Sequence, residues 1–560
     1  MNDTVAVMIA RAALVLAAAL PAIAAEPATE SARVDALFAA YDKPDSPGCA
    51  VGVIRDGRFV LAKGYGMASL EQHAPISPST VMDPGSLAKQ FTAAAVALLS
   101  TQGRLSLDDD VRRFVPELPV YSAPIRLRHL LRHTSGLRDY PALFALQGVD
   151  PSGPITEAQT LAMLSRQRSL NFTPGTEHLY NNSGYFLLAL VVKRASGKPF
   201  AQFMRESFFV PLGMTRTRVV DDVSVSIPGR SLTYAPADGG GWRIAVSATQ
   251  TVGDGGVLTT VEDLLAWDAN SYTGKVGGTR FLEIVNAPGT LDDGTRIAYG
   301  AGQFVREYRG LRIVEHGGDA PGLTAYMARF PDQRLTAMCL CNLPNFGTID
   351  AVHRMADIYL EKAIASRKQV ELILRGAPPP LEVGAYAGVY RSRTSEMAWR
   401  VSVAGGKLLV DSPPTPQALA PEDGNRFSIA GASVRSTITF DVDASLSRPR
   451  SFTLAREGRT PELFDRVDEA DPSTAAELAQ YAGLYYSDEI EGVLKLRAGE
   501  GALRATNLDV TMKPAYRDGF NGSGTRLRFE RDGEGRIVAV WAAVGYNRGV
   551  RYRRIEAAAP

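Results

Sequence analysis

The hydrophobic residues of this chain change their spacing along its length, and the changes divide it into three parts. In the first part, residues 31–367, runs typical of β-strands stand near both ends. Two of them, Cys49–Ile54 and Phe59–Tyr65, flank a turn at Arg55-Asp56-Gly57 and predict a hairpin. Three more strands are expected late in this part: Leu311–Glu315, Leu323–Phe330 and Leu335–Cys341.

Helical spacing of apolar residues fills the interval between these two groups of strands. The expected helices are Ser86–Thr101, Ile125–Leu131, Ile155–Gln167, Ser183–Arg194 and Val261–Asn270, and a further helix, Val352–Ile364, follows the last strand. A sheet built from both ends of a region, with helices inserted between them, predicts an α+β fold.

After Pro378-Pro379-Pro380 the pattern becomes strand-like, with alternating runs such as Trp399–Val403 and Ser436–Phe440. A short repeat marks two blocks of this kind: Tyr386-Ala387-Gly388-Val389-Tyr390 returns as Tyr481-Ala482-Gly483-Leu484-Tyr485. Asp468–Pro472 is a polar linker between the two copies. We therefore expect two related antiparallel β-barrels, at residues 381–467 and 475–556.

Composition narrows the functional classes. The chain has 560 residues, of which 45% are apolar and 22% charged, as is usual for soluble globular proteins. The formal net charge of +1 gives no electrostatic reason to expect nucleic acid or an anionic membrane as a partner. The oligomeric state is not predicted by these features.

The first 25 residues are typical of a signal peptide. Val5–Leu20 is apolar except for Arg11, and small residues suited to cleavage follow at Ala22–Ala25. Translation from Met8 rather than Met1 would make Arg11 the usual positive charge of such a peptide. The apolar run is short for a membrane span. We expect an exported protein, periplasmic or secreted, with no membrane span after removal of the signal.

Three cysteines are present. Cys339 and Cys341 lie two residues apart in an expected strand, which puts both on one face but spaces them poorly for bonding each other. Metal-ligand spacing is not found around them. They are therefore predicted to be small buried hydrophobic residues, and no metal or other cofactor is expected.

Chemistry is indicated first by Ser86-Leu87-Ala88-Lys89, at the start of an expected helix. Free N–H groups at a helix start favour developing negative charge on a serine oxygen. A lysine three residues later lies on the same face, within reach of the serine hydroxyl. Burial would lower the basicity of Lys89 and suit it to accept a proton near neutral pH. An ordinary helix-capping serine with a surface lysine is the alternative.

Two further segments complete a candidate site. Tyr180-Asn181-Asn182 precedes a helix, where a tyrosine oxygen near lysine can act as a base and an asparagine amide can hold a substrate carbonyl. His316-Gly317-Gly318 ends an expected strand, and its glycines permit close approach of a substrate backbone. The N–H of Asp319, opposite that of Ser86, would then form an oxyanion hole. Turn chemistry alone would also account for both segments.

His129 and His133 have a helical i, i+4 spacing that a metal site can use. An H-E-x-x-H pattern requires an acidic partner between them, and none is present here. We expect both histidines to be structural.

Taken together and in this order, the three segments resemble those of the serine β-lactamase and penicillin-binding protein family, in its class C-like branch. The supporting segments are Gly103–Asp109, His129–Leu137, Pro211–Met214, Gly255–Leu258 and Asp263-Leu264. The layout with two β-rich blocks is most similar to that of D-stereospecific aminopeptidases. The resemblance implies a β-lactamase-like hydrolase fold followed by two barrels.

The resemblance also implies roles for individual residues. Ser86 would be the nucleophile, Lys89 its activator, and Tyr180 the base that passes the proton to the leaving group. Asn182 would bind the acyl-side amide, and His316 would take the family's usual lysine position beside Gly317 and Gly318.

The histidine at position 316 bears on the substrate. A lysine there would stay cationic and hold a substrate carboxylate, whereas histidine titrates near neutrality. This difference favours aminopeptidase, amidase or esterase action on a small peptide, amide or ester. With the resemblance, the leading prediction is D-aminopeptidase-like cleavage of a short peptide or amide. The alternatives are a carboxylesterase, β-lactamase or DD-carboxypeptidase of the same family, or a cell-wall-binding module with a retired site. The resemblance to D-stereospecific members implies a loop from the last barrel that restricts the site. The comparable stretch here, Asp518–Thr525, is short and rich in glycine, so a more open cleft is expected.

Overall fold

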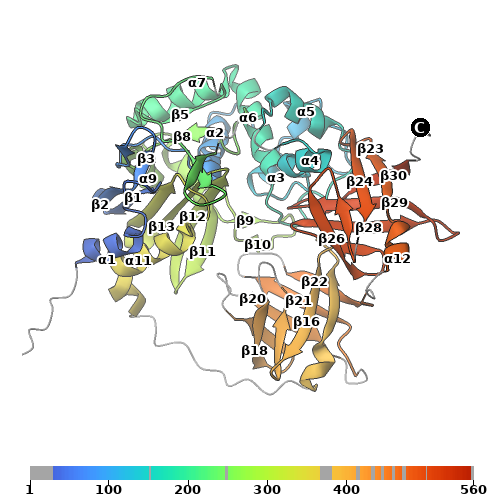
Figure 1. Ribbon diagram of the computed structural model, residues 1–560. Helices are drawn as coiled ribbons and strands as arrows, with labels where there is room; N and C mark the ends of the chain where they lie inside the picture. Colours follow the sequence, from blue (N-terminus) through green and yellow to red (C-terminus); the bar gives the residue numbers. More distant parts are fainter. Residues whose placement is uncertain are drawn as a thin grey trace, which may run out of the picture.

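The computed structural model describes residues 29–555, apart from 151–152, 223, 246–249, 366–380, 412–415, 431–435, 443–446, 457–460, 470–473 and 500. The predicted signal peptide and Pro378-Pro379-Pro380 therefore lie outside the described residues. The chain forms a mixed region of sheet and helices, residues 29–365, called here the N-terminal region, and two β-barrels (Figure 1). None of the described helices is long and apolar enough to cross a membrane.

A six-stranded antiparallel sheet organises the N-terminal region, in the order β11-β12-β13-β14-β1-β2. Its strands are β1 Cys49–Arg55, β2 Arg58–Tyr65, β11 Phe304–Tyr308, β12 Leu311–Ala320, β13 Leu323–Phe330 and β14 Leu335–Cys341. The predicted hairpin and the three predicted late strands are confirmed. β1 pairs with β14 along its whole length, so strands from both ends of the region are neighbours inside the sheet.

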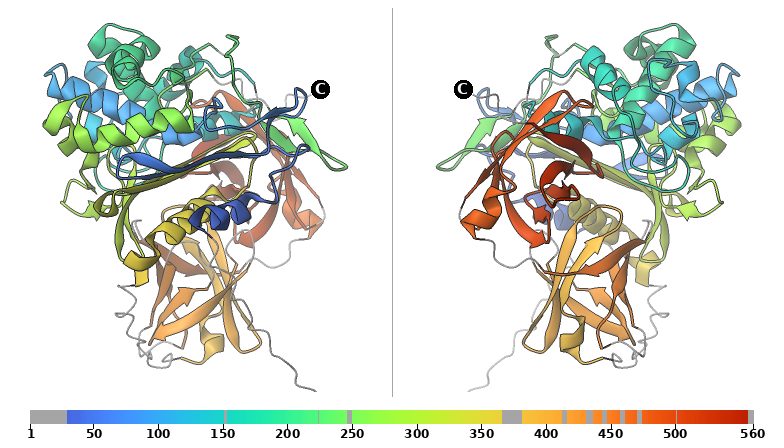
Figure 2. Two further views of the ribbon diagram at one scale, coloured as in Figure 1. Left: turned by 90° about the vertical axis from the view of Figure 1, so that its left-hand side faces the viewer. Right: turned by 90° about the vertical axis from the view of Figure 1, so that its right-hand side faces the viewer.

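Helices cover both faces of this sheet (Figure 2). On one face, α1 (Glu30–Phe38) and α11 (Thr348–Ala365) pack against alternate strand residues such as Val51 and Val53. Their neighbours Ala50 and Ile54 point to the other face and join the core around α2. Because successive strand residues point to opposite faces, β1 contributes to two cores at once.

The helical layer contains most of the predicted helices with small shifts at their ends. Its helices are α2 Lys89–Thr101, α3 Leu127–Leu131, α4 Tyr140–Gln147, α5 Glu157–Ser165, α6 Asn182–Ser196, α7 Phe200–Met204, α8 Val210–Leu212, α9 Val261–Thr273 and α10 Gly278–Asn286. Short 3₁₀ turns lie at η1 Gly85–Ala88, η2 Val111–Arg113 and η4 Pro331–Gln333, and the π-helical turn η3 spans Arg205–Phe209. Short strands complete the layer: β3 Met67–Ser69, β4 Ala74–Pro75, β5 Arg218–Val219, β6 Tyr234–Pro236, β7 Trp242–Ile244, β8 Val257–Leu258, β9 Gly289–Thr290 and β10 Arg296–Ile297.

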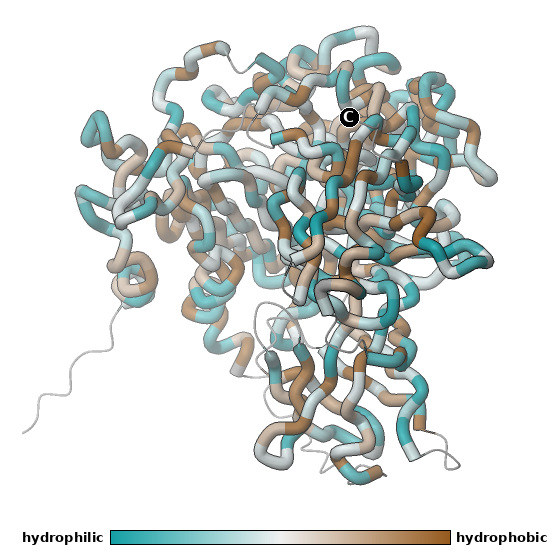
Figure 3. The backbone as a smooth tube through the Cα atoms, turned by 45° about the vertical axis from the view of Figure 1, so that its right-hand side comes forward, coloured by the Kyte–Doolittle hydropathy of each residue, from teal (hydrophilic) through white to brown (hydrophobic). Residues whose placement is uncertain are grey.

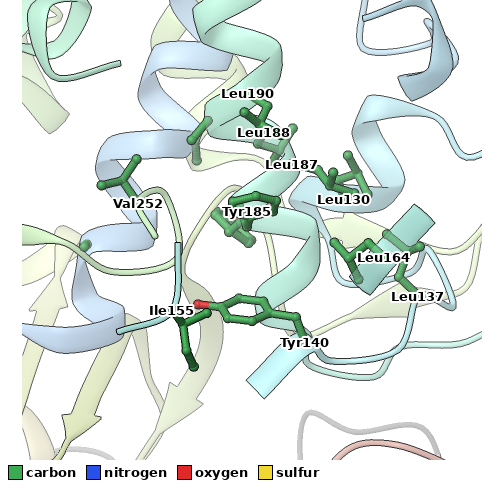
Figure 4. Packing of buried hydrophobic residues seen from close by; sticks show 14 of the residues in the cluster. Leu130, Leu137, Tyr140, Ile155, Leu164, Tyr185, Leu187, Leu188, Leu190 and Val252 are labelled. Atoms are coloured by element: carbon green, nitrogen blue, oxygen red, sulfur yellow. The ribbon is translucent and has the colours of Figure 1, made fainter. Parts of the chain in front are cut away.

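Helix α6 is the centre of the helical layer. Ten of its residues, from Ser183 to Val192, are buried. Figure 4 shows Tyr185, Leu187 and Leu188 of this helix among side chains from neighbouring segments. Because α6 is enclosed on nearly all sides, the residues at its N-terminus are held in fixed positions.

The cysteine prediction is wrong for Cys341 and is confirmed for Cys339. Cys49 of β1 stands directly opposite Cys341 of β14, and the two form a disulfide across 292 residues of sequence. Cys339 is a free, buried thiol, as predicted. The spacing between Cys339 and Cys341 excluded a bond between them, but it held no information about the register of β1 on β14.

The C-terminal blocks form two closed antiparallel barrels of eight strands each, as predicted. The first barrel, opened by the turn η6 Val383–Tyr386, contains β15 Gly388–Ser392, β16 Ala398–Ala404, β17 Lys407–Val410, β18 Gln417–Asp423, β19 Arg426–Ile429, β20 Ser436–Asp441, β21 Ser451–Arg456 and β22 Glu462–Val467. The second barrel, preceded by helix α12 Ala475–Ala479, contains β23 Gly483–Ser487, β24 Gly492–Ala498, β25 Leu503–Ala505, β26 Val510–Tyr516, β27 Gly519–Asn521, β28 Thr525–Arg531, β29 Ile537–Val544 and β30 Val550–Ile555. Hydrophobic and hydrophilic positions alternate along their strands (Figure 3).

The two barrels relate differently to the N-terminal region. Buried residues of the second barrel, such as Tyr485 and Tyr552, belong to the same hydrophobic cluster as α2, α4 and α6. The first barrel encloses a separate cluster that includes Phe440 and Phe452. In Figure 1 the second barrel (red) stands beside α3, α4 and α5, whereas the first barrel (orange) projects away from them.

Candidate active site

Ser86 lies in the 3₁₀ turn η1, just before α2 begins at Lys89. Gly85 makes the approach to this turn possible because its φ is +54°, which an L side chain rarely adopts. The Gly85 N–H donates to Asp83 Oδ1 at 2.8 Å and fixes the preceding bend. Ser86 is partly exposed, whereas Lys89 is fully buried. The predicted continuous helix from Ser86 is thus a tighter turn followed by an α-helix.

The Lys89 ammonium position is defined by three oxygen atoms. Nζ lies 3.0 Å from Ser86 Oγ, 2.8 Å from Asn182 Oδ1 and 2.8 Å from the carbonyl oxygen of Asp254. Burial lowers the pKa of Lys89 to about 8, although the nearby carboxyls of Asp254 and Asp139 act in the opposite direction. A neutral amine here would donate to Asn182 and Asp254 and direct its lone pair at the Ser86 hydroxyl.

Two buried carboxyl groups surround the lysine. Burial raises the pKa of Asp139 to about 6, and it also raises the pKa of Asp254. Asp139 Oδ1 accepts from the Asn182 N–H at 2.6 Å, and Asp254 Oδ2 accepts from the Tyr140 hydroxyl at 2.9 Å. The Asn182 N–H belongs to the first turn of α6, where a carboxylate is stabilised. Sequence reasoning had named neither acid, because neither belongs to one of the three segments.

The Tyr180–Asn182 segment is held by the loop that follows α3. The Leu179 N–H donates to the carbonyl oxygen of His133 at 2.9 Å, and the Asn181 N–H donates to His133 Nδ1 at 3.1 Å. The Asn181 side chain caps α6 by accepting from the Gly184 N–H at 2.8 Å. Tyr180 stacks at a tilt on His133, with ring centroids 4.3 Å apart.

Tyr180 therefore reaches the pair formed by Ser86 and Lys89. Lys89 Nζ lies 5.0 Å from the centroid of its ring, and its hydroxyl is close enough to Ser86 for that residue to lower the pKa of Tyr180. Burial raises the pKa of Tyr180 well above its ordinary value. The side chain is therefore a phenol at neutral pH, which suits it to pass a proton on rather than to act as a free phenolate.

The His316–Gly318 segment lies inside β12, not at a strand end as expected. β11 pairs with β12 only as far as Glu315, so residues 316–320 leave one strand edge free and approach η1 instead. A Cβ on Gly318 would lie 1.9 Å from the Pro84 carbonyl oxygen and 2.7 Å from the Ser86 nitrogen. A Cβ on Gly85 would lie 2.9 Å from the Asp319 nitrogen. Glycine at both positions thus lets the two backbones touch, and it brings together the N–H groups predicted to form an oxyanion hole.

His316 is buried beneath the site. Its Nε2 is 3.0 Å from the Tyr299 hydroxyl, and its Nδ1 is 2.6 Å from the Gly317 carbonyl oxygen. Burial, with a contribution from Lys89, lowers the pKa of His316 to about 3. The expectation that this histidine titrates near neutrality is wrong: its desolvation keeps the ring neutral throughout the physiological range.

The side chains of His129 and His133, the two histidines with metal-ligand spacing, do not point to a common site. His129 Nδ1 accepts from the Arg126 N–H, and its Nε2 is 3.3 Å from Asp292 Oδ1. His133 lies beyond the end of α3, with a φ of +55°, and turns toward Tyr180. The i, i+4 relation between them is therefore lost at the helix end.

The barrel segment that reaches the site is not the predicted one. Asp518, at the start of the predicted stretch, binds Arg531 and Tyr481 within the second barrel, and Asn521 donates to the first barrel at Ala398. The turn between β29 and β30, residues 545–549, lies at the site instead. Its Tyr546 ring is 5.5 Å from that of Tyr180, and 42% of its surface is exposed. Gly524, in the predicted stretch, accepts from the Gly545 N–H and so adjoins this turn.

Comparison with known proteins finds relatives that match most of the chain. The Beta-lactamase family model matches residues 34–360. The chain is 27% identical to D-aminopeptidase from Brucella anthropi over 538 residues, which cover 91% of this chain and 96% of the relative. It is 26% identical to D-aminopeptidase from Gluconobacter oxydans over 543 residues, which cover 94% and 99%.

Among solved structures, the octameric penicillin-binding protein homologue from Pyrococcus abyssi is similar in fold. Its TM-score is 0.53 at 22% sequence identity, and the match covers 75% of this chain and 96% of that one.

Proposed function

The chain belongs to the Beta-lactamase family and is a serine hydrolase, and we propose that it is an exported D-aminopeptidase-like enzyme that works through an acyl-enzyme on Ser86. The observation that carries the proposal is the 3.0 Å contact between Lys89 Nζ and Ser86 Oγ. With a pKa of about 8, Lys89 carries a free amine in roughly a tenth of the molecules at pH 7.

The acylation step begins with this amine. Lys89 Nζ takes the hydroxyl proton of Ser86 while Oγ attacks the carbonyl carbon of the substrate amide. The carbonyl oxygen becomes an oxyanion, which accepts hydrogen bonds from the N–H groups of Ser86 and Asp319. Asn182 Nδ2 is available to hold the acyl-side amide, because its Oδ1 is engaged by Lys89.

Collapse of this intermediate breaks the C–N bond. The leaving amine needs a proton, and the Tyr180 hydroxyl, which lies beside Ser86 and Lys89, would deliver one and be reprotonated from Lys89. Water then attacks the Ser86 ester under the same groups, releases the acid and restores the serine.

Electrostatics favour a substrate with a cationic amino group. The carboxyls of Asp139 and Asp254 act on Lys89, whereas burial keeps His133 and His316 neutral. His316 therefore provides no cation where the family's usual lysine would hold a substrate carboxylate. This supports aminopeptidase or amidase action over β-lactam or DD-carboxypeptidase action, both of which use a substrate carboxylate.

Export is supported by the apolar N-terminus together with the Cys49–Cys341 disulfide, because disulfides persist in oxidising compartments. The purified, denatured chain is expected to show one free thiol before reduction and three after it. Three thiols before reduction would count against an oxidising location.

The experiment for the whole proposal combines labelling with a substrate panel. A fluorophosphonate probe should label the wild type, and the Ser86→Ala variant should lose both labelling and hydrolysis by at least about 10³-fold. Ser165→Ala is the matched control, since this serine donates only to its own helix at Leu161. D-alanyl anilide should be cleaved faster than L-alanyl anilide, a nitrophenyl ester or a chromogenic cephalosporin. A Ser86→Ala variant as active as the wild type would refute the proposal.

A further inference from the structure

The turn between β29 and β30 of the second barrel carries a fully buried side chain at the edge of the site. Asn547 is 1% exposed, although it belongs to a turn that otherwise reaches solvent at Tyr546. The turn is fixed on both sides. The Arg548 guanidinium pairs with Glu177, with the shorter contact at 2.6 Å, and the Gly549 carbonyl oxygen accepts from Arg138 at 3.0 Å.

Asn547 is bound to a single residue of the N-terminal region through both ends of its amide. Its Oδ1 accepts from the Asp139 N–H at 2.6 Å, and its Nδ2 donates to the Asp139 carbonyl oxygen at 3.3 Å. A side-chain amide that satisfies the N–H and the C=O of one residue fixes the position of that residue in two directions. The position of Asp139 is therefore set from the second barrel.

Asp139 is the next link toward the chemistry. Its Oδ1 accepts from the Asn182 N–H at 2.6 Å, and Asn182 Oδ1 accepts from Lys89 Nζ at 2.8 Å. The series thus runs from Asn547 through Asp139 and Asn182 to Lys89, with a direct hydrogen bond at each step. Asn547 contacts neither Ser86 nor Lys89 in these bonds and acts through the residues between them.

We propose that Asn547 is a positioning residue for acylation. It holds the Asp139 carboxyl against the first turn of α6 and so keeps the side chains of Asn182 and Lys89 in place beside Ser86. This inference rests on the proposed function of the same site. It assigns the second barrel a part in the chemistry, because a displacement of about 1 Å in such an arrangement can cost on the order of 10²-fold in rate.

The test compares Asn547→Ala with Asn507→Ala. Asn507 is a matched control in the same barrel: its Oδ1 accepts from the Lys495 N–H at 3.0 Å, and its Nδ2 donates to the Val493 carbonyl oxygen at 2.9 Å. Both variants lose two amide-to-backbone bonds. Asn547→Ala should lower kcat by about 10- to 100-fold with little change in KM and slow fluorophosphonate labelling by a similar factor. Asn507→Ala should leave kcat within about 2-fold.

A double-mutant cycle shows whether the effect passes through Asp139. In an Asp139→Ala background the carboxyl is absent, so Asn547→Ala should cost less than about 3-fold in kcat/KM. Fully additive losses would overturn the inference, as would an equal loss of kcat in Asn507→Ala. Should Asn547→Ala fail to fold, Asn547→Asp retains the acceptor for the Asp139 N–H. It is expected to lose about 3- to 10-fold in kcat, and undiminished kcat in a folded Asn547→Asp would overturn the inference.

The outcome also separates this inference from the proposed function. A Ser86→Ala variant that keeps its activity refutes the function and, with it, the inference. Loss of activity in Ser86→Ala together with unchanged kcat in Asn547→Ala refutes the inference alone.

Discussion

The two barrels share a construction and differ in what they touch. In the first, the Tyr390 hydroxyl donates to the Tyr386 carbonyl oxygen at 2.9 Å, and in the second Tyr485 donates to Tyr481 at 2.8 Å. An arginine from the last strand of each barrel, Arg466 or Arg554, donates to the backbone of the repeated segment. The five-residue repeat found in the sequence thus marks the same local structure twice.

Their surroundings separate them. The second barrel shares a hydrophobic cluster with the N-terminal region and places Tyr546 and Asn547 at the site. The first barrel has its own cluster, and its contacts through Glu396 and Ala398 go to the second barrel. A duplicated fold can therefore differ in its surroundings: one copy adjoins the candidate active site, while the other contacts the second barrel.

The largest difference between the barrels is expected from matched core substitutions. Phe529→Ala in the second barrel and Phe452→Ala in the first should each cost about 3–5 kcal/mol locally, since both rings are buried. Calorimetry should show Phe529→Ala destabilising the transition of the N-terminal region and second barrel together. Phe452→Ala should lower only a separate transition and leave hydrolysis intact. Loss of activity in both variants would contradict the comparison.

The polar contact between the second barrel and the N-terminal region supplies the next prediction. Arg138 is 4% exposed and pairs with Glu489 while donating to Gln167 and to the Gly549 carbonyl oxygen. Arg138→Ala leaves Glu489 without its cation at a largely buried position and should cost about 3 kcal/mol in the free energy of unfolding.

The control for Arg138 is an exposed ion pair of the first barrel. Arg393 pairs with Asp465, and the arginine side chain is 61% exposed. Arg393→Ala should cost less than about 1 kcal/mol, because solvent screens such pairs. Urea denaturation measures both variants, and equal costs would count against a buried contact between the second barrel and the N-terminal region.

The pH dependence of hydrolysis gives a third prediction. In the proposed mechanism Lys89 loses its proton before it activates Ser86, so kcat/KM should rise with pH through about 8. Asp139 stabilises the ammonium form, and Asp139→Asn should therefore move this rise to lower pH. The Phe452→Ala variant of the first barrel should leave the rise where it is. A profile with no inflection between pH 7 and 9, or a shift to higher pH in Asp139→Asn, would contradict the assignment.

Much of this architecture was predictable because it depends on local pattern. The hairpin of β1 and β2 and the strands β13 and β14 have the alternation and turn residues that such elements require. Ser86 and Lys89 meet because a three-residue spacing brings side chains onto one helical face. Tyr180 also lies beside them. This proximity was implied only by the resemblance to a family, because no sequence spacing relates Tyr180 to Ser86 or Lys89.

The remaining features depend on contacts between distant segments. The Cys49–Cys341 bond follows from the pairing of β1 with β14, and the neutrality of His316 follows from its burial beside Tyr299. The carboxyls of Asp139 and Asp254 reach Lys89 only when α4, α6 and the loop before β8, which contains Asp254, pack together. Asn547 is 408 residues from Asp139, so composition and periodicity contain no signal for that pair.

The smallest expected effects come from the repeated tyrosines themselves, which test whether the two copies differ in surroundings rather than in construction. Tyr390→Phe and Tyr485→Phe each remove one buried hydroxyl from a backbone carbonyl and should cost about 1 kcal/mol. The Tyr485→Phe loss should fall on the transition that includes the N-terminal region, and the Tyr390→Phe loss on the transition of the first barrel. Because neither hydroxyl contacts Asp139, Asn182 or Lys89, kcat should stay within about 2-fold in both variants. A calorimetric shift of the same single transition in both would mean that the barrels unfold as one unit with the hydrolase.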